Sequence, residues 1–171
     1  MTTCNNLQPG SLAQPEQAVG RAVRNPCADG GLPPGLLGAP ATALAYLELP
    51  ALAASVPLAR RHVRGTLAQW GLGAVADDAE TVTSELVTNA IVASAALAFR
   101  AEVGLLVATC PGQLMVLVWD ASSDRPVRRH DDDDAVAGRG LGIVAALSAR
   151  CGWTPDGRGK VVWAVLDLAR P

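Results

Sequence analysis

Two consecutive helical patterns separate the first predicted strand from the second, and a hairpin follows them. The predicted elements run in the order strand 44–49, helix 53–70, helix 77–99, strand 101–109, strand 114–119, helix 141–150 and strand 161–168. Parallel strands need a crossover between them, so a hairpin at this point argues against a doubly wound parallel sheet. The order instead predicts an α+β fold, a two-layer sandwich in which about three helices cover one face of a mostly antiparallel or mixed sheet.

Local signals support the second helix and the hairpin. Leu86, Ala90 and Ala93 follow the three- and four-residue spacing of a buried helix face. We expect Asp77 or Asp78 to cap the N-terminus of this helix, because a side-chain oxygen there can accept a hydrogen bond from a backbone N–H group. The sequence Cys-Pro-Gly-Gln at 110–113 is typical of a hairpin turn.

The chain is predicted to divide near residue 42. Residues 1–40 hold six of the twelve prolines and six of the seventeen glycines, with four charged residues. No apolar periodicity continues through these breakers. We therefore interpret residues 1–42 as a flexible leader and residues 43–171 as one folded domain.

Composition excludes several classes of function. The formal net charge of -2 argues against a protein that binds nucleic acid directly by neutralising phosphates. No apolar run approaches the roughly 18 residues that a membrane-spanning helix needs. Four cysteines without a C-x-x-C pair, and only two histidines, give little material for a zinc site. We expect free thiols and a cytoplasmic location.

A first candidate cluster lies on the second predicted helix. Glu85 and Asn89 are four residues apart and therefore project from the same side of that helix, one turn apart. A carboxylate and a carboxamide in this arrangement can supply a base and an oxygen ligand for a metal ion. The alternative is that both side chains belong to a solvated helix face.

A second candidate is Asp120, which ends an apolar strand and precedes Ala-Ser-Ser at 121–123. A carboxylate at a strand end can accept a hydrogen bond from an exocyclic amine such as that of adenine. The alternative is ordinary turn chemistry, because Asp and Ser are frequent turn residues.

A third candidate is the glycine-rich segment from Gly138 through Arg139 and Gly140 to Gly142, at the entry to a predicted helix. Glycines let backbone N–H groups approach a ligand closely, and a helix N-terminus favours an anion. Arg139 adds a positive charge suited to phosphate. Lys160, the only lysine, follows another glycine turn and either meets a phosphate or simply belongs to that turn.

In this order and spacing the clusters resemble the ATP-binding domain of the GHKL superfamily. The matching runs are Ser84-Glu85-Leu86-Val87-Thr88-Asn89-Ala90, Asp120-x-Ser122-x-x-x-Pro126, Gly138-Arg139-Gly140-Leu141-Gly142 and Gly159-Lys160-x-x-Trp163. The D-x-S-x-x-x-P form of the second run is most similar to the anti-sigma-factor serine/threonine kinases of actinomycetes. The resemblance covers about residues 44–168 and implies a Bergerat-type ATP-binding fold.

The resemblance also implies a role for each matching residue. Asn89 would bind a Mg²⁺ ion that bridges the phosphates of ATP, and Glu85 would orient or deprotonate the attacking hydroxyl. Asp120 would hold the adenine amine, and residues 121–137 would form a lid over the nucleotide. The remaining predicted nucleotide-binding residues are Ser122, Gly138, Arg139, Gly140, Leu141, Gly142 and Lys160.

The implied function is that of an anti-sigma factor that binds a sigma factor and phosphorylates a serine or threonine on an anti-anti-sigma antagonist protein. Relatives of this type often form homodimers through the sheet edge or the first helix. Two alternatives stay open, namely a nucleotide-gated binding module that no longer transfers phosphate and a scaffold that never binds nucleotide. The chain departs from the pattern in two places, because Ala93 stands where many relatives have His and because Asp131–Asp134 bring four negative charges into the lid.

Overall fold

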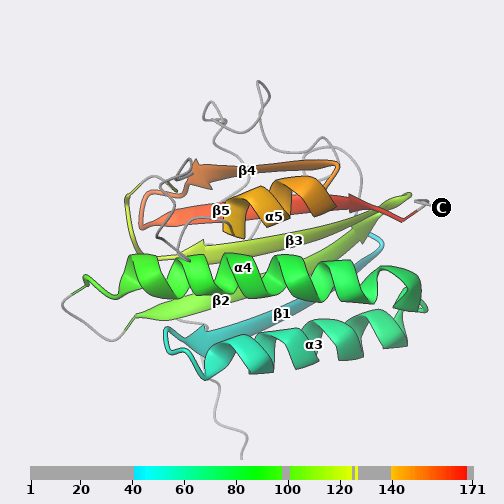
Figure 1. The fold of residues 1–171 in the computed structure, drawn as a ribbon, viewed down its shortest axis with the longest axis horizontal. Helices are drawn as coiled ribbons and strands as arrows, with labels where there is room; N and C mark the ends of the chain where they lie inside the picture. Colours follow the sequence, from blue (N-terminus) through cyan, green and yellow to red (C-terminus); the bar gives the residue numbers. More distant parts are fainter. Residues whose placement is uncertain (1–40, 98–100, 125, 127–139, 169–171) are drawn as a thin grey trace, which may run out of the picture.

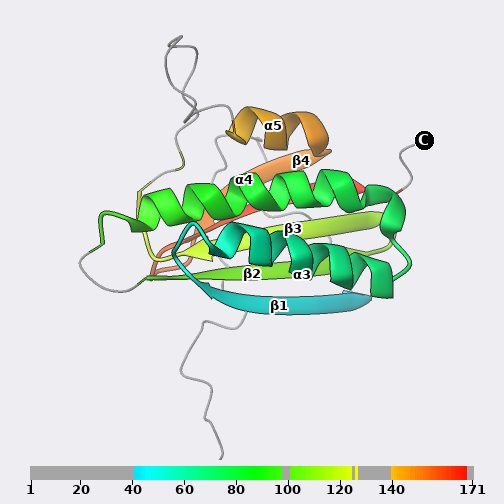
Figure 2. The same ribbon diagram turned by 60° about the horizontal axis from the view of Figure 1, so that its bottom comes forward.

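The computed structural model describes residues 41–97, 101–124, 126 and 140–168. The predicted leader and most of the predicted lid lie outside these residues. In the described part, a five-stranded antiparallel sheet carries three α-helices on one face (Figures 1 and 2). The predicted α+β two-layer architecture is confirmed.

Four of the five strands closely follow the predicted ranges, and the sheet has the order β1-β2-β3-β5-β4. Their bounds are β1 (Ala43–Pro50), β2 (Glu102–Cys110), β3 (Gln113–Asp120), β4 (Arg150–Pro155) and β5 (Lys160–Asp167). β2 and β3 form the expected hairpin, in which Cys110 pairs with Gln113. Gly112 has a positive φ of 74°, a conformation that a side chain would disfavour and that explains the glycine at this turn.

Within the described ranges, three α-helices and one short 3₁₀-helix make up the second layer. They are α3 (Ser55–Gln69), η1 (Gly73–Val75), α4 (Ala76–Ser94) and α5 (Gly140–Leu147). The expected cap at Asp77 or Asp78 is wrong, because α4 begins at Ala76 and both aspartates lie in its first turn. Asp77 instead accepts a hydrogen bond from Arg64 of α3 at 2.7 Å.

The main apolar core lies between the helices and the sheet. Leu67 of α3, Leu86 of α4 and Val116 of β3 are fully or almost fully buried in it. Since strand side chains alternate between faces, a second buried cluster lies on the other face of the sheet. That cluster is built from strand residues of β2, β3 and β5, namely Leu106, Ala108, Cys110, Met115, Leu117, Val161, Trp163 and Val165.

β4 was not predicted from the sequence, and the helix predicted before it, at 141–150, extends beyond the end of α5. α5 ends at Leu147, and the Ala149 N–H group already donates to the Val165 carbonyl at 2.8 Å. β4 is a six-residue edge strand that contains Gly152 and ends at Pro155, so its composition carries little strand signal. No helix in the described ranges is both long and apolar enough to cross a bilayer.

Candidate active site

Glu85 and Asn89 lie where the buried side of α4 meets its exposed side. Leu86 and Ala90 are buried in the core, whereas Glu85 and Asn89 are half-buried. The four-residue spacing places the carboxylate and the carboxamide one helical turn apart on the same side. The pair therefore borders the core rather than standing on a fully solvated face.

Gly140, the first residue of α5, packs directly onto this pair. A Cβ atom added to Gly140 would overlap Glu85 Oε2 and would lie 3.7 Å from Asn89 Nδ2. Only a residue without a side chain lets the start of α5 pack this closely against Glu85. The structure thus brings the glycine-rich helix entry and the Glu–Asn pair together, although the two segments are far apart in sequence.

The other residues of the glycine-rich segment contribute differently. Gly138 and Arg139 lie outside the described residues. Leu141 is half-buried and packs against the main core, which anchors the first turn of α5. A Cβ atom on Gly142 would meet nothing within 4 Å, so this glycine is not required by packing.

Asp120 ends β3 on the face that carries the helices. It is fully buried, and its Oδ1 atom accepts hydrogen bonds from Lys160 Nζ at 2.7 Å and from the Ser122 N–H group at 2.9 Å. The Asp124 N–H group donates to Ser122 Oγ at 3.1 Å, which orders the chain directly after the strand. Ser122 therefore shapes the turn around Asp120.

The second carboxylate oxygen of Asp120 is an unused acceptor. Oδ2 is buried and has no hydrogen-bond partner among the described residues. Burial raises the pKa of Asp120, and the hydrogen bond and charge of Lys160 oppose that increase. A buried acceptor without a partner costs free energy, so this atom is suited to a ligand that donates a hydrogen bond.

Lys160 is the first residue of β5 and lies opposite Asp120 in the strand register. Only 3% of it is exposed, and Nζ also donates to the Ser122 carbonyl at 3.2 Å. Lys160 is thus a member of a buried ion pair rather than a solvated turn residue.

The turn that precedes β5 also packs against the end of β3. A Cβ atom on Gly159 would overlap the Asp120 carbonyl oxygen and would lie 2.8 Å from Ala121 Cα. Trp119 Nε1 donates to Asp156, which ties β3 to the β4–β5 turn. The sequence predicted that Gly159 belongs to a turn but did not predict this packing against β3. The Gly-Lys pair directly before the last strand was the one signal for it.

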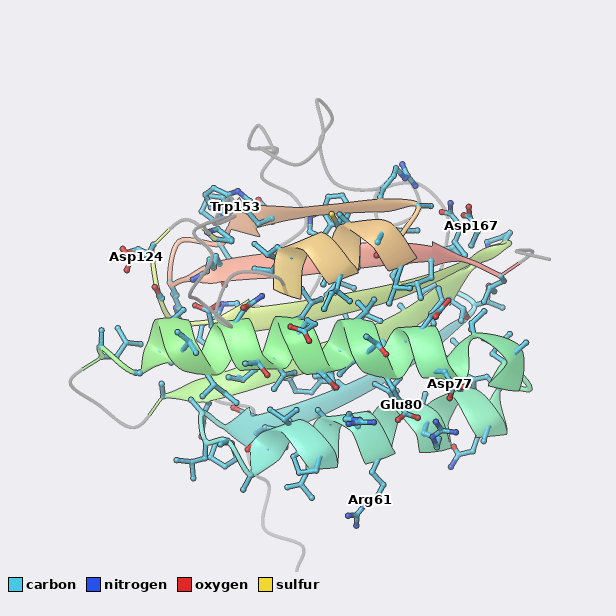
Figure 3. All side chains as sticks on the ribbon, viewed as in Figure 1. Arg61, Asp77, Glu80, Asp124, Trp153 and Asp167 are labelled. Carbon is cyan, nitrogen blue, oxygen red and sulfur yellow. The ribbon has the colours of Figure 1, made fainter. Side chains whose placement is uncertain are left out.

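The two halves of the candidate site lie on the same side of the molecule. In both ribbon views, the end of β3, the beginning of α5 and the C-terminal half of α4 share one end (Figures 1 and 2). Asp124, just after β3, lies at this end, whereas Asp77 and Glu80 of α4 lie toward the opposite end (Figure 3).

The residues present fit a magnesium nucleotide. No group of three or more His, Cys, Asp or Glu side chains occurs in the described part of the chain, so these residues do not form a complete protein cage for a metal ion. Mg²⁺ commonly takes one or two protein oxygens and completes its shell with phosphates and water. Asn89, beside Glu85 and close to Gly140, suits that mode of binding.

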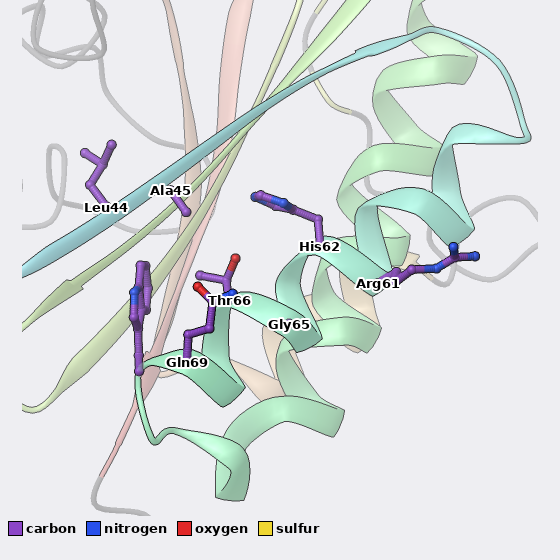
Figure 4. A pocket seen from close by; sticks show the side chains of 8 residues that line it. Leu44, Ala45, Arg61, His62, Gly65, Thr66 and Gln69 are labelled. Atoms are coloured by element: carbon purple, nitrogen blue, oxygen red, sulfur yellow. The ribbon is translucent and has the colours of Figure 1, made fainter.

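A separate cavity of about 380 Å³ lies between β1 and α3 (Figure 4). None of the predicted site residues lines it. Its lining residues are Leu44, Ala45, Arg61, His62, Gly65, Thr66, Gln69 and Trp70. Burial lowers the pKa of His62 there, which favours the neutral imidazole.

Comparison with known proteins identifies the domain. A search of curated proteins gives no match. The family model described as histidine kinase-like ATPase domain matches residues 49–166, which include α4, Asp120, α5 and Lys160. The match spans more than half of the chain, and the chain therefore belongs to the histidine kinase-like ATPase domain family, which implies that it binds a nucleotide.

Proposed function

We propose that this protein is an ATP-binding anti-sigma factor that phosphorylates a serine or threonine on an anti-anti-sigma antagonist. The proposal combines the family assignment with the D-x-S-x-x-x-P run from Asp120 to Pro126, which resembles that kinase branch. The single structural observation that carries it is the contact of Gly140 with Glu85 and Asn89. That contact brings a carboxylate and a carboxamide to the start of a helix, which supports their assignment as base and metal ligand.

Each residue has a defined task in this proposal. The N-terminus of α5 holds phosphate oxygens through its backbone N–H groups, with Arg139 adding positive charge. Asn89 holds the magnesium ion, which neutralises charge on the phosphates when bound. Asp120 accepts a hydrogen bond from the adenine amine through its unused Oδ2 atom.

The transfer step uses Glu85 as the base. Glu85 accepts the proton of the acceptor hydroxyl while that oxygen attacks the γ-phosphorus, and the bond to the β–γ bridging oxygen breaks to release ADP. Phosphoryl transfer depends mostly on positioning and on charge stabilisation, so a base, an amide ligand and backbone donors suffice. The acceptor hydroxyl comes from the partner protein.

A nucleotide-gated module without catalysis is the second candidate. Binding ATP requires Asn89 and the glycines more than it requires a base. The presence of Glu85 against Gly140 therefore favours transfer over binding alone. A scaffold that never binds nucleotide would not need the close packing of Gly140 against Glu85 or the unused acceptor on Asp120.

The proposed partners are a sigma factor and its antagonist protein, in the cytoplasm and without direct contact to nucleic acid or membrane. A homodimer would form through the sheet edge, where β1 and β4 are the two edge strands of the described sheet, or through the first helix. Ala93 is half-buried one turn after Asn89 and leaves a smaller side chain where relatives carry His. Asp131–Asp134 lie outside the described residues, and we assign them to partner selection.

The decisive experiment combines Mg·ATP with candidate antagonist proteins from the same genome. Phosphoserine or phosphothreonine on one antagonist supports the kinase, and calorimetry measures ATP binding in parallel. Replacing Glu85 by Gln should lower transfer by about 10²- to 10⁴-fold and leave ATP affinity intact. If the unaltered protein binds ATP but transfers phosphate to none of the antagonists, the result favours the silent binding module. If it does not bind Mg·ATP, both the kinase and the binding module are refuted.

A further inference from the structure

The buried pair formed by Asp120 and Lys160 is incompletely satisfied in a way that points to a ligand. Asp120 is 0% exposed and Lys160 is 3% exposed. A buried ion pair is stable only when its remaining donors and acceptors also find partners.

Asp120 uses one oxygen and keeps the other. Oδ1 accepts from Lys160 Nζ at 2.7 Å and from the Ser122 N–H group at 2.9 Å. Oδ2 is buried and, within the described ranges, has no partner. The carboxylate therefore offers one acceptor to a ligand.

Lys160 keeps a donor on the other member of the pair. An ammonium group carries three N–H donors. Two of them are used within the described part of the chain, toward Asp120 Oδ1 and toward the Ser122 carbonyl at 3.2 Å. The third donor and the free Oδ2 belong to groups held 2.7 Å apart, so together they offer a ligand one donor and one acceptor side by side.

We propose that Lys160 is a base-reading residue, which donates a hydrogen bond to a ring nitrogen beside the adenine amine while Asp120 Oδ2 accepts from that amine. The inference rests on the proposed binding of ATP and specifies how the base is read. Adenine presents an amine N–H next to an acceptor nitrogen, which matches the acceptor and donor left over on the buried pair.

This role differs from a phosphate contact. Lys160 already neutralises Asp120, and a cation bonded to a carboxylate is a weaker partner for a phosphate. The N-terminus of α5 at Gly140 packs against Glu85 and lies near Asn89, so that half of the site suits the phosphates. Lys160 is thereby assigned to the base, with Gly159 holding its strand against the Asp120 carbonyl.

The test compares nucleotides that lack one acceptor nitrogen. Affinities of ATP, 1-deaza-ATP and 7-deaza-ATP are measured by calorimetry for the unaltered protein and for Lys160→Met. In the unaltered protein, one of the two deaza analogues should bind about ten- to a hundredfold more weakly than ATP, since a charge-assisted hydrogen bond is lost. In Lys160→Met, ATP and that analogue should bind equally.

A merely structural role for Lys160 predicts a different result. Lys160→Met would then weaken all three nucleotides and leave the ratio between ATP and the analogue unchanged, which would overturn the inference. Equal binding of all three nucleotides to the unaltered protein would overturn it as well. Failure of the ATP binding on which the inference rests is distinguishable, because it would appear as no binding of Mg·ATP at all, and loss of transfer alone would leave these affinities unaffected.

Two further variants complete the design. Arg158→Met removes an exposed positive charge two residues before Lys160. The ratio between the affinities for ATP and for the deaza analogue should stay as it is in the unaltered protein. If Lys160→Met does not fold, the double variant Asp120→Asn with Lys160→Met takes its place. It removes both buried charges at once, so neither is left buried without its partner. In that double variant the discrimination against the deaza analogue should again be absent, and its persistence would contradict the role of Lys160.

Discussion

Gly140 lies so close to Glu85 that a single methyl group on Gly140 would overlap the Oε2 atom of that carboxylate. The contact joins the start of α5 to the middle of α4 and fixes the position of Glu85, the proposed base, relative to the helix N-terminus. It therefore gives a direct way to displace the base without changing its chemistry.

Gly140→Ala should reduce phosphoryl transfer strongly, because Glu85 or the first turn of α5 must shift to accommodate the new Cβ. A misplacement of about 1 Å in a catalytic group can lower the rate by about a hundredfold. Transfer to the antagonist is measured at saturating Mg·ATP, with circular dichroism to confirm folding. Gly142→Ala is the matched control, because a Cβ there meets nothing within 4 Å and transfer should be nearly unchanged. Equal losses in both variants would show that the contact with Glu85 is not the cause.

Gly159→Ala should lower both stability and nucleotide affinity. Its Cβ would overlap the backbone carbonyl of Asp120, and backbone atoms within paired strands cannot move as a flexible side chain can. We expect a loss of about 1–3 kcal/mol in the free energy of unfolding, as for other overpacked sites. Urea unfolding gives this value, and Gly73→Ala, where a Cβ has open space, should show a much smaller change. A Gly159→Ala protein as stable as the original would mean that β3 and the β4–β5 turn can separate at little cost.

The main elements of the fold were readable from the sequence because each carries its own local pattern. The three- and four-residue apolar spacing of α4 and the Pro-Gly turn before β3 are signals of this kind. β4 was missed because an edge strand with Gly152 and Pro155 needs little strand propensity when β5 supplies its hydrogen bonds. Local pattern gives no information about such tertiary support.

The resemblance to a known family indicated the site residues, but the contacts between them follow from how distant strands and helices pack and pair. Lys160 meets Asp120 only because β5 pairs with β3 in a register that places these two residues opposite one another, 40 positions apart in the chain. The overlap between Gly140 and Glu85 likewise depends on how α5 crosses α4. Neither the unused Oδ2 atom nor the buried state of Lys160 has a counterpart in the spacing of residues, which is why the sequence left Lys160 between two interpretations.

Glu80 of α4 should stabilise the packing of α3 more than Asp77 does. Glu80 is 6% exposed and lies between Arg60, at 3.6 Å, and Arg64. The side chain of Asp77 is 91% exposed, and exposed ion pairs contribute little to stability. Glu80→Gln should therefore lower the midpoint of thermal unfolding clearly, whereas Asp77→Asn should leave it almost unchanged. The prediction fails if 1 M salt, which screens exposed pairs, reduces the midpoint as much as Glu80→Gln does.

Lys160→Met should destabilise the protein more at neutral pH than at acidic pH. Burial raises the pKa of Asp120 above its ordinary value of 3.8, and Lys160 opposes that increase. A raised pKa in the folded state means that ionising Asp120 costs stability as the pH rises through that pKa, and that the cost disappears when the carboxyl is protonated. Without Lys160 the pKa rises further and the cost at neutral pH becomes larger, by about 3–5 kcal/mol for a broken buried pair. Unfolding free energies of the original protein and of Lys160→Met, measured by urea titration between pH 7 and pH 4, should therefore converge as the pH falls.

In a background that already carries Asp120→Asn, Lys160→Met should lose this convergence, since no carboxyl remains to titrate. If the gap between the two proteins stays constant from pH 7 to pH 4, the Asp120 carboxylate is not the group that Lys160 stabilises.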